Sequence, residues 1–175
     1  MALDFTRLWN ACPADYNPCR IGDGSPAFEN QCAIRVGLAL AGGGVDLRSY
    51  RGVRCWHGHA GTHLLRGEEL MEWLNRKPEL FGEPEVRTAT DEGSYIGRRG
   101  IIFCQNFWGT GNQGDHIDLW NLTEMRYGTP DYIRRSQRVH FWTIDASNSD
   151  FLKHFSGERG EKLFVRQAPK DPKDE

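Results

Sequence analysis

The hydrophobic period of this chain changes once, after Arg99, and this change constrains the fold more than any other feature. Before it, apolar residues recur with helical spacing in three segments, 5–11, 30–40 and 67–77. After it, three segments have the composition and alternation of strands, 100–108, 116–121 and 138–144. Helices followed by antiparallel strands predict an α+β fold with two segregated layers.

The length and charge of the chain limit its organisation and its partners. At 175 residues we expect one domain over residues 1–167, followed by a polar, Pro-containing and disordered tail over 168–175. Lys and Arg number 22 against 24 Asp and Glu, a net charge of −2, which argues against a nucleic-acid or anionic-membrane partner. No apolar run approaches the ~20 residues of a membrane span, and no signal peptide is visible at the start.

Five cysteines are too few for a disulfide scaffold, and their odd number leaves at least one thiol unpaired. Cys12 and Cys19, in a Pro-rich loop, could form a disulfide or remain two free thiols. Cys32 lies in the first turn of the predicted helix 30–40, for which Asn30 is a suitable N-cap. Free N–H groups and the positive end of the helix dipole favour a thiolate there, so Cys32 is a candidate nucleophile. The alternative is a cysteine packed in the core.

Strand alternation places His116, Asp118 and Trp120 on one face, while the two apolar residues between them face the core. We therefore expect the polar face to lie on the surface or in a cleft. A histidine there could act as the general base for a thiol, and a third polar group would orient its ring. Asp118 and Glu124 are both candidates for that third group. The alternative is a half-exposed strand with solvated polar side chains.

Several segments together resemble a known family, the type VI secretion amidase effectors of the fourth family. The most specific motifs are Asn-Gln-Cys-Ala-Ile-Arg at 30–35 and Asp-His-Ile-Asp-Leu-Trp-Asn at 115–121, supported by segments 64–74, 100–103 and 139–144. The resemblance covers roughly residues 5–145 in the same order. It implies a papain-like fold of the NlpC type, in which the nucleophile helix packs on an antiparallel sheet that carries the histidine.

The resemblance also implies a function. The family cleaves peptidoglycan stem peptides between γ-D-glutamate and meso-diaminopimelate. We therefore expect an antibacterial effector that is made in the cytoplasm, exported by the type VI secretion machinery and active in the periplasm of target bacteria. Its expected partners are the stem peptide, that machinery and a cognate immunity protein, and no cofactor is expected.

Carried over by motif, Cys32 is the nucleophile and His116 the base, with backbone N–H groups at the helix start holding the oxyanion. The third member of the triad is an acidic residue beyond the histidine in the family. An ungapped match puts Tyr127 at that place, and a short deletion puts Glu124 there. Glu124 and Asp118 therefore both stay open.

An alternative hypothesis is a zinc-dependent hydrolase, in which Cys55, His57, His59 and His63 would bind the metal. The spacing does not match a closed structural site and no cysteine pair supports it, so we expect no metal. We expect Trp56 to lie beside the cleft and, with Trp120, to contact the substrate. A third hypothesis is a papain-like binding module that has lost its enzymatic activity.

Overall fold

The computed structural model describes residues 3–59, 61–108 and 114–144. The end of the predicted domain, 145–167, and the predicted tail, 168–175, lie outside the described residues. Residues 109–113, between two of the predicted strands, lie outside them too.

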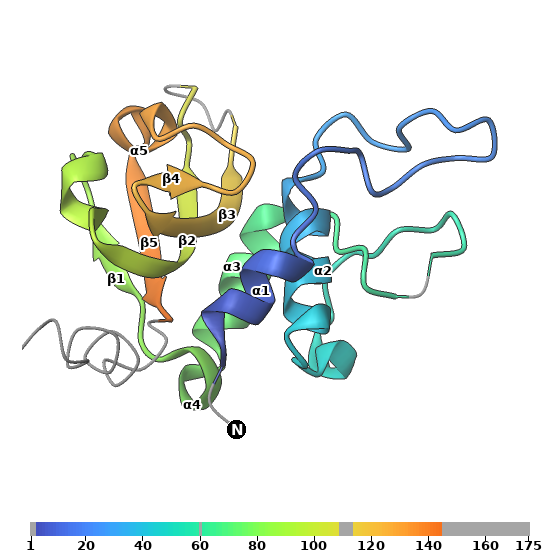
Figure 1. Ribbon diagram of the computed structural model, residues 1–175, viewed down its shortest axis with the longest axis horizontal. Helices are drawn as coiled ribbons and strands as arrows, with labels where there is room; N and C mark the ends of the chain where they lie inside the picture. Colours follow the sequence, from blue (N-terminus) through green and yellow to red (C-terminus); the bar gives the residue numbers. More distant parts are fainter. Residues whose placement is uncertain (1–2, 60, 109–113, 145–175) are drawn as a thin grey trace, which may run out of the picture. The chain divides into compact units, whose positions relative to one another are not determined.

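The described residues form short helices and one sheet (Figure 1). The α-helices are α1 (Phe5–Ala11), α2 (Cys32–Gly42), α3 (Gly67–Asn75), α4 (Pro78–Phe81) and α5 (Asp131–Arg135), and the 3-10 helices are η1 (Leu47–Ser49) and η2 (Glu92–Tyr95). The strands are β1 (Glu85–Arg87), β2 (Arg98–Gln105), β3 (His116–Leu122), β4 (Glu124–Met125) and β5 (Arg138–Thr143). Within the part of the chain that is described, no helix has the length and apolar character needed to cross a membrane.

All three predicted helices and all three predicted strands are present, as α1, α2, α3, β2, β3 and β5. A local polar group fixes the start of the first helix. Asp4 caps α1 by accepting a hydrogen bond from the backbone N–H of Thr6 at 2.9 Å. The strands β1 and β4 have no counterpart in the prediction, because three and two residues are too short to show an alternating pattern.

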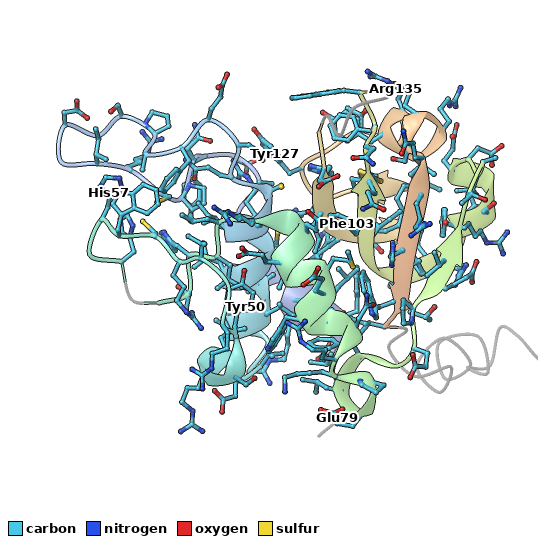
Figure 2. The ribbon with its side chains drawn as sticks, turned by 180° about the vertical axis from the view of Figure 1, so that it is seen from behind. Tyr50, His57, Glu79, Phe103, Tyr127 and Arg135 are labelled. Atoms are coloured by element: carbon cyan, nitrogen blue, oxygen red, sulfur yellow. The ribbon has the colours of Figure 1, made fainter. Side chains whose placement is uncertain are left out.

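The five strands form one antiparallel sheet in the order β1-β5-β2-β3-β4. Helices α1, α2 and α3 contribute to an apolar core on one face of this sheet, and Phe103 lies in it between α3 and the sheet (Figure 2). On the other face, η2 and α5 contribute Tyr95 and Ile133 to a second core. The predicted α+β fold is therefore confirmed, with apolar packing on both faces of the sheet.

The second core corrects one prediction. The face of β3 that carries Trp120 was expected on the surface or in a cleft, with the indole in contact with substrate. Trp120 is instead 0% exposed in the second core, and its indole N–H donates to the backbone carbonyl of Tyr95 at 2.8 Å. The elements that cover this face, η2 and α5, are too short to leave a pattern in the sequence, so the alternation of β3 predicts only one buried face.

Two long connections, residues 12–31 and 51–66, contain no helix or strand among their described residues. We call them together the loop region, and they extend beside the first part of α2 (Figure 1). Each is closed by an isolated bridge, Arg20 with Pro26 and Arg54 with Leu64. The two connections meet where the sulfur atoms of Cys19 and Cys55 lie 3.4 Å apart.

Candidate active site

Cys32 is the first residue of α2 and lies at the wall of a cleft of about 350 Å³. The cleft is lined by Asn30, Cys32, Leu65, Arg66, Gly67, Glu68, Glu69 and Asp115. The N-cap residue of α2 is Gln31, one residue after the predicted Asn30, and the Gln31 side chain makes no capping hydrogen bond. Asn30 still satisfies one free donor of the first turn, because its Oδ1 accepts a hydrogen bond from the backbone N–H of Cys32 at 3.0 Å. The thiol therefore lies at the positive end of a helix and next to a cavity large enough for a peptide segment.

His116 is the first residue of β3, and its buried ring contacts both Cys32 and Asp118. Nε2 of His116 lies 3.0 Å from Oδ2 of Asp118, which leaves Nδ1 for the hydrogen bond with the Cys32 thiol. Burial lowers the pKa of His116, but the hydrogen bonds and negative charges of Asp118 and Cys32 outweigh it and raise this pKa to about 9. The imidazole is therefore protonated at neutral pH.

Asp118 is 2% exposed and fully occupied by hydrogen bonds. Its Oδ1 accepts from the backbone N–H of Leu119 at 2.8 Å. Its Oδ2 accepts from the backbone N–H groups of Tyr127 at 3.0 Å and Gly128 at 2.7 Å, besides the contact with His116. Three backbone donors thus fix the carboxylate, which in turn fixes the orientation of the imidazole.

Glu124, the other candidate for the third position, does not lie near His116. It is exposed in β4 and pairs with Asn121 of β3. Five residues of extended strand separate Asn121 from His116, a distance of about 16 Å. The hairpin after β3 therefore returns Glu124 to the far end of the strand, and the geometry favours Asp118.

Tyr127, the residue at the ungapped family position, contributes its backbone to the site and its ring to another contact. The Arg35 guanidinium lies 3.7 Å from the centre of the Tyr127 ring. Arg35 is itself buried in α2 and donates to the carbonyl of Pro13 at 2.7 Å and to Oδ1 of Asn17 at 3.2 Å. Tyr127 thus lies between the loop region and the sheet (Figure 2). The apolar pattern of the helix does not indicate that Arg35 is buried.

Gly128 is a further residue of the site, and no pattern in the sequence indicates it. A Cβ atom at this position would lie 2.4 Å from Nε2 of His116 and 2.9 Å from Sδ of Met125. Both distances are shorter than van der Waals contact, so only glycine fits beside the ring here. No spacing or motif could have indicated this, because the contact joins a turn to the start of β3.

Trp56 is 69% exposed in the loop region. Its ring packs edge-on against Phe28 with centroids 5.1 Å apart, so an aromatic residue from each loop meets here. His57, at the tip of the same loop (Figure 2), is exposed and its ring lies 5.8 Å from that of Phe28.

The suspected metal cluster has a different composition from the predicted one. The ligand atoms of Cys55, His59 and His63 lie within 4.8 Å of one another and of a fourth residue, Cys19. His57 is not among them, because its ring turns outward to Phe28. All five cysteines are free, so the possible Cys12–Cys19 disulfide is not formed.

Comparison with known proteins agrees with this architecture. A sequence model of a protein family, described as type VI secretion system (T6SS), amidase effector protein 4 (Tae4), matches residues 28–142. A comparison with curated proteins finds no significant match. Solved structures are also similar in fold, and two of them serve as examples. The Tae4–Tai4 effector–immunity complex from Salmonella Typhimurium matches with a TM-score of 0.65 and 18% identity, covering 83% of this chain and 100% of that chain. Tae4 from Enterobacter cloacae matches with a TM-score of 0.64 and 17% identity, covering 83% and 98%.

At these identities the solved structures establish the fold, which is the α+β arrangement expected for a papain-like domain. The family model covers more than half of the chain, including Cys32, His116 and Asp118. The chain belongs to the Tae4 family of type VI secretion amidase effectors.

Proposed function

We propose that this protein is a cysteine amidase that cleaves the γ-D-glutamyl–meso-diaminopimelate bond of peptidoglycan stem peptides. The observation that carries the proposal is one buried histidine between two partners. His116 forms a hydrogen bond with Cys32 at the start of α2 and another with the fixed carboxylate of Asp118. Nucleophile, base and orienting group are the three parts of a thiol-dependent amide hydrolase. Membership of an amidase effector family supports the same reaction.

The reaction follows from the positions of these groups. The Cys32 thiolate attacks the γ-glutamyl carbonyl carbon, and the charge moves to the carbonyl oxygen. The N–H of Cys32 already donates to Asn30. The oxyanion is therefore stabilised by the other free N–H groups of the first turn, those of Ala33 and Ile34. If the Asn30 side chain is displaced, the N–H of Cys32 becomes a further donor.

His116 then gives its proton to the departing amine of diaminopimelate, and the tetrahedral intermediate collapses to a thioester on Cys32. Water enters after the amine leaves. His116 removes a proton from this water, which hydrolyses the thioester and regenerates the thiolate–imidazolium pair. In this mechanism the nucleophile and the acid–base group are side chains of the protein, and the oxyanion donors are backbone N–H groups.

The cleft beside Cys32 has charges of both signs, which suit the zwitterionic diaminopimelate residue. Arg66 is available for its carboxylate, although it also pairs with Glu69 at 2.9 Å. Glu68 and Asp115 line the same cleft and are available for its ammonium group. Trp56, exposed in the loop region, is our candidate for contact with a more distant part of the stem peptide or its sugar.

We also propose that the protein acts in the periplasm of a competing cell and is inhibited in its producer by a cognate immunity protein. Solved complexes of Tae4 with the immunity protein Tai4, from Salmonella Typhimurium and from Enterobacter cloacae, are similar in fold to this chain, which supports a partner of this kind. A surface that covers the 350 Å³ cleft would block access to Cys32.

The test is digestion of purified Gram-negative sacculi, followed by mass spectrometry of the released fragments. The wild type should release fragments cut between glutamate and diaminopimelate, Glu124→Gln should do the same, and Cys32→Ala should release none. Equal cutting by Cys32→Ala would show that the cysteine is structural. Absence of cutting by the wild type, with no iodoacetamide labelling of Cys32 near neutral pH, would favour a binding module instead.

A further inference from the structure

We propose that Cys19, Cys55, His59 and His63 form a structural zinc site, which joins the two connections of the loop region beside the start of α2. The site is independent of the proposed amidase chemistry. It replaces the expectation that the protein holds no metal.

The distances between the four side chains fit a single tetrahedral ion. The two sulfur atoms are 3.4 Å apart, and Nδ1 of His59 lies 3.3 Å from the Cys19 sulfur and 3.1 Å from the Cys55 sulfur. Zn–S bonds of about 2.3 Å and Zn–N bonds of about 2.0–2.1 Å place tetrahedral ligand atoms roughly 3.3–3.8 Å apart. Small movements of these side chains would therefore complete the site.

His63 supplies the fourth position. Its ring lies 4.4 Å from that of His59, and the side chain is only 8% exposed. Among the described residues, Nδ1 of His63 is buried without a hydrogen-bond partner. A buried ring nitrogen without a partner costs free energy, which a bound metal would recover.

The donor set selects zinc. Two thiolates and two imidazoles in a tetrahedral arrangement are typical of structural zinc, and the three-residue gap between His59 and His63 falls within the usual spacing. Zinc would displace one proton from each thiol, and the two thiolate charges would balance the charge of the ion. The resulting centre is neutral, which suits a site in which Cys19 is fully buried.

Four protein ligands leave no open position for water, so the site is structural and not hydrolytic. The location of the site indicates which segment the metal would hold in place. Gln31, the residue before Cys32, accepts from the backbone N–H of Cys19 and donates to its carbonyl, both at 2.8 Å. Cys19 belongs to neither of the two apolar cores. A metal would therefore fix a segment that apolar packing does not hold, next to the nucleophile.

The competing occupant of these positions is a disulfide between Cys19 and Cys55. It would use both sulfur atoms but leave His59 and His63 without a role. The two states differ in metal content, in the number of free thiols and in mass, so one preparation can distinguish them.

The experiment measures zinc by mass spectrometry in the full chain, purified without a metal-affinity tag from zinc-replete cells. We expect about one zinc ion per chain in the wild type and less than a tenth of this in Cys19→Ser and His63→Asn. The matched control is His57→Asn, a histidine of the same loop that lies outside the cluster, and it should keep the full zinc content.

Two measurements on the wild type keep the proposal testable if the ligand variants do not fold. Replacement of zinc by Co²⁺ should give the visible absorption of tetrahedral cobalt and a thiolate charge-transfer band. Thiol titration in denaturant with a chelator should detect all five cysteines. Zinc-free protein with five free thiols and no cobalt spectrum would overturn the proposal. Zinc-free protein with three free thiols and a mass lower by two hydrogens would overturn it in favour of the disulfide.

Discussion

The two halves of the candidate active site are held by different forces. The part of the chain from β1 to β5, residues 85–143, is called the sheet region. There His116 and Asp118 lie on a strand that is packed between two apolar cores. In the loop region, the segment next to Cys32 is held through polar side chains. These are chiefly Gln31 and the cluster of Cys19, Cys55, His59 and His63. Apolar packing is spread over many atoms, whereas hydrogen bonds and metal-type contacts depend on a few. The proposed base, His116, should therefore be sensitive to substitutions that alter its own contacts. The proposed nucleophile, Cys32, should be sensitive to substitutions in loops that never touch substrate.

The largest effect is expected for Asp118→Asn. An amide NH₂ would replace one acceptor oxygen in a carboxylate that receives three backbone N–H groups, and the negative charge beside His116 would be lost. We expect kcat/KM on sacculi to fall by about 10³-fold or more. Glu124→Gln is the control and should change the rate by less than about twofold. If Glu124→Gln has the larger effect, our assignment of the orienting residue is wrong.

The pH dependence of stability is the next prediction. The pKa of His116 is raised from 6.5 to about 9 in the folded chain, so protonation favours folding. This contribution is complete below about pH 6.5 and is lost as pH rises through about 9, with a total of about 3 kcal/mol at most. The groups that face the ring are Asp118, Cys32 and the ring of Tyr132.

The measurement is urea denaturation of the wild type and His116→Asn between pH 6 and pH 10. The difference in unfolding free energy should shrink as pH rises. A difference that is constant or grows with pH would show that the ring is neutral in the folded protein.

Gly128→Ala tests how closely the sheet region surrounds the histidine. The added methyl would lie 2.4 Å from Nε2 of His116, so the ring must move away from Asp118. A displacement of about 1 Å in a catalytic group costs about 10²-fold in rate. Gly22→Ala is the matched control, because its Cβ has no atom within 4 Å. Unchanged kcat for Gly128→Ala would mean that the base tolerates movement.

Gln31→Leu tests the loop region. The variant loses the two hydrogen bonds with Cys19 and a third with the carbonyl of Phe28 at 3.0 Å, and it leaves the buried N–H of Cys19 without an acceptor. We expect a loss of about 2–3 kcal/mol in unfolding free energy. Gln137→Leu, at an exposed glutamine of the sheet region, should stay within about 0.5 kcal/mol. Equal effects of the two variants would remove the contrast between the regions.

The sequence was most informative where the signal is local. The segments 5–11 and 116–121 were predicted from spacing alone and are present as α1 and β3. The start of α2 lies within one residue of the prediction: Asn30 accepts a hydrogen bond from the N–H of Cys32, but the N-cap position is Gln31. These features depend on residues within a few positions of one another, so a linear pattern contains them.

Other features depend on which segments fold against each other. The alternation of β3 placed Asp118 and Trp120 on the same face, but only η2 and α5 decide that this face is buried. The choice between Asp118 and Glu124 likewise depends on the register of β3 with β4. A two-residue strand leaves no periodic signal from which that register could be read.

The loop region shows most clearly which features the sequence predicts and which depend on the tertiary structure. The sequence by itself determined that Cys55, His59 and His63 are four residues apart along one loop, and it made each a possible ligand. It also offered His57, which is adjacent in the chain but points away from the others. Only the tertiary structure brought in Cys19, from a connection 36 residues earlier, to complete the set of four. Ligand chemistry is a property of residue type, whereas a coordination sphere requires atoms within a few ångströms, and in an irregular loop no repeat along the chain encodes such a distance.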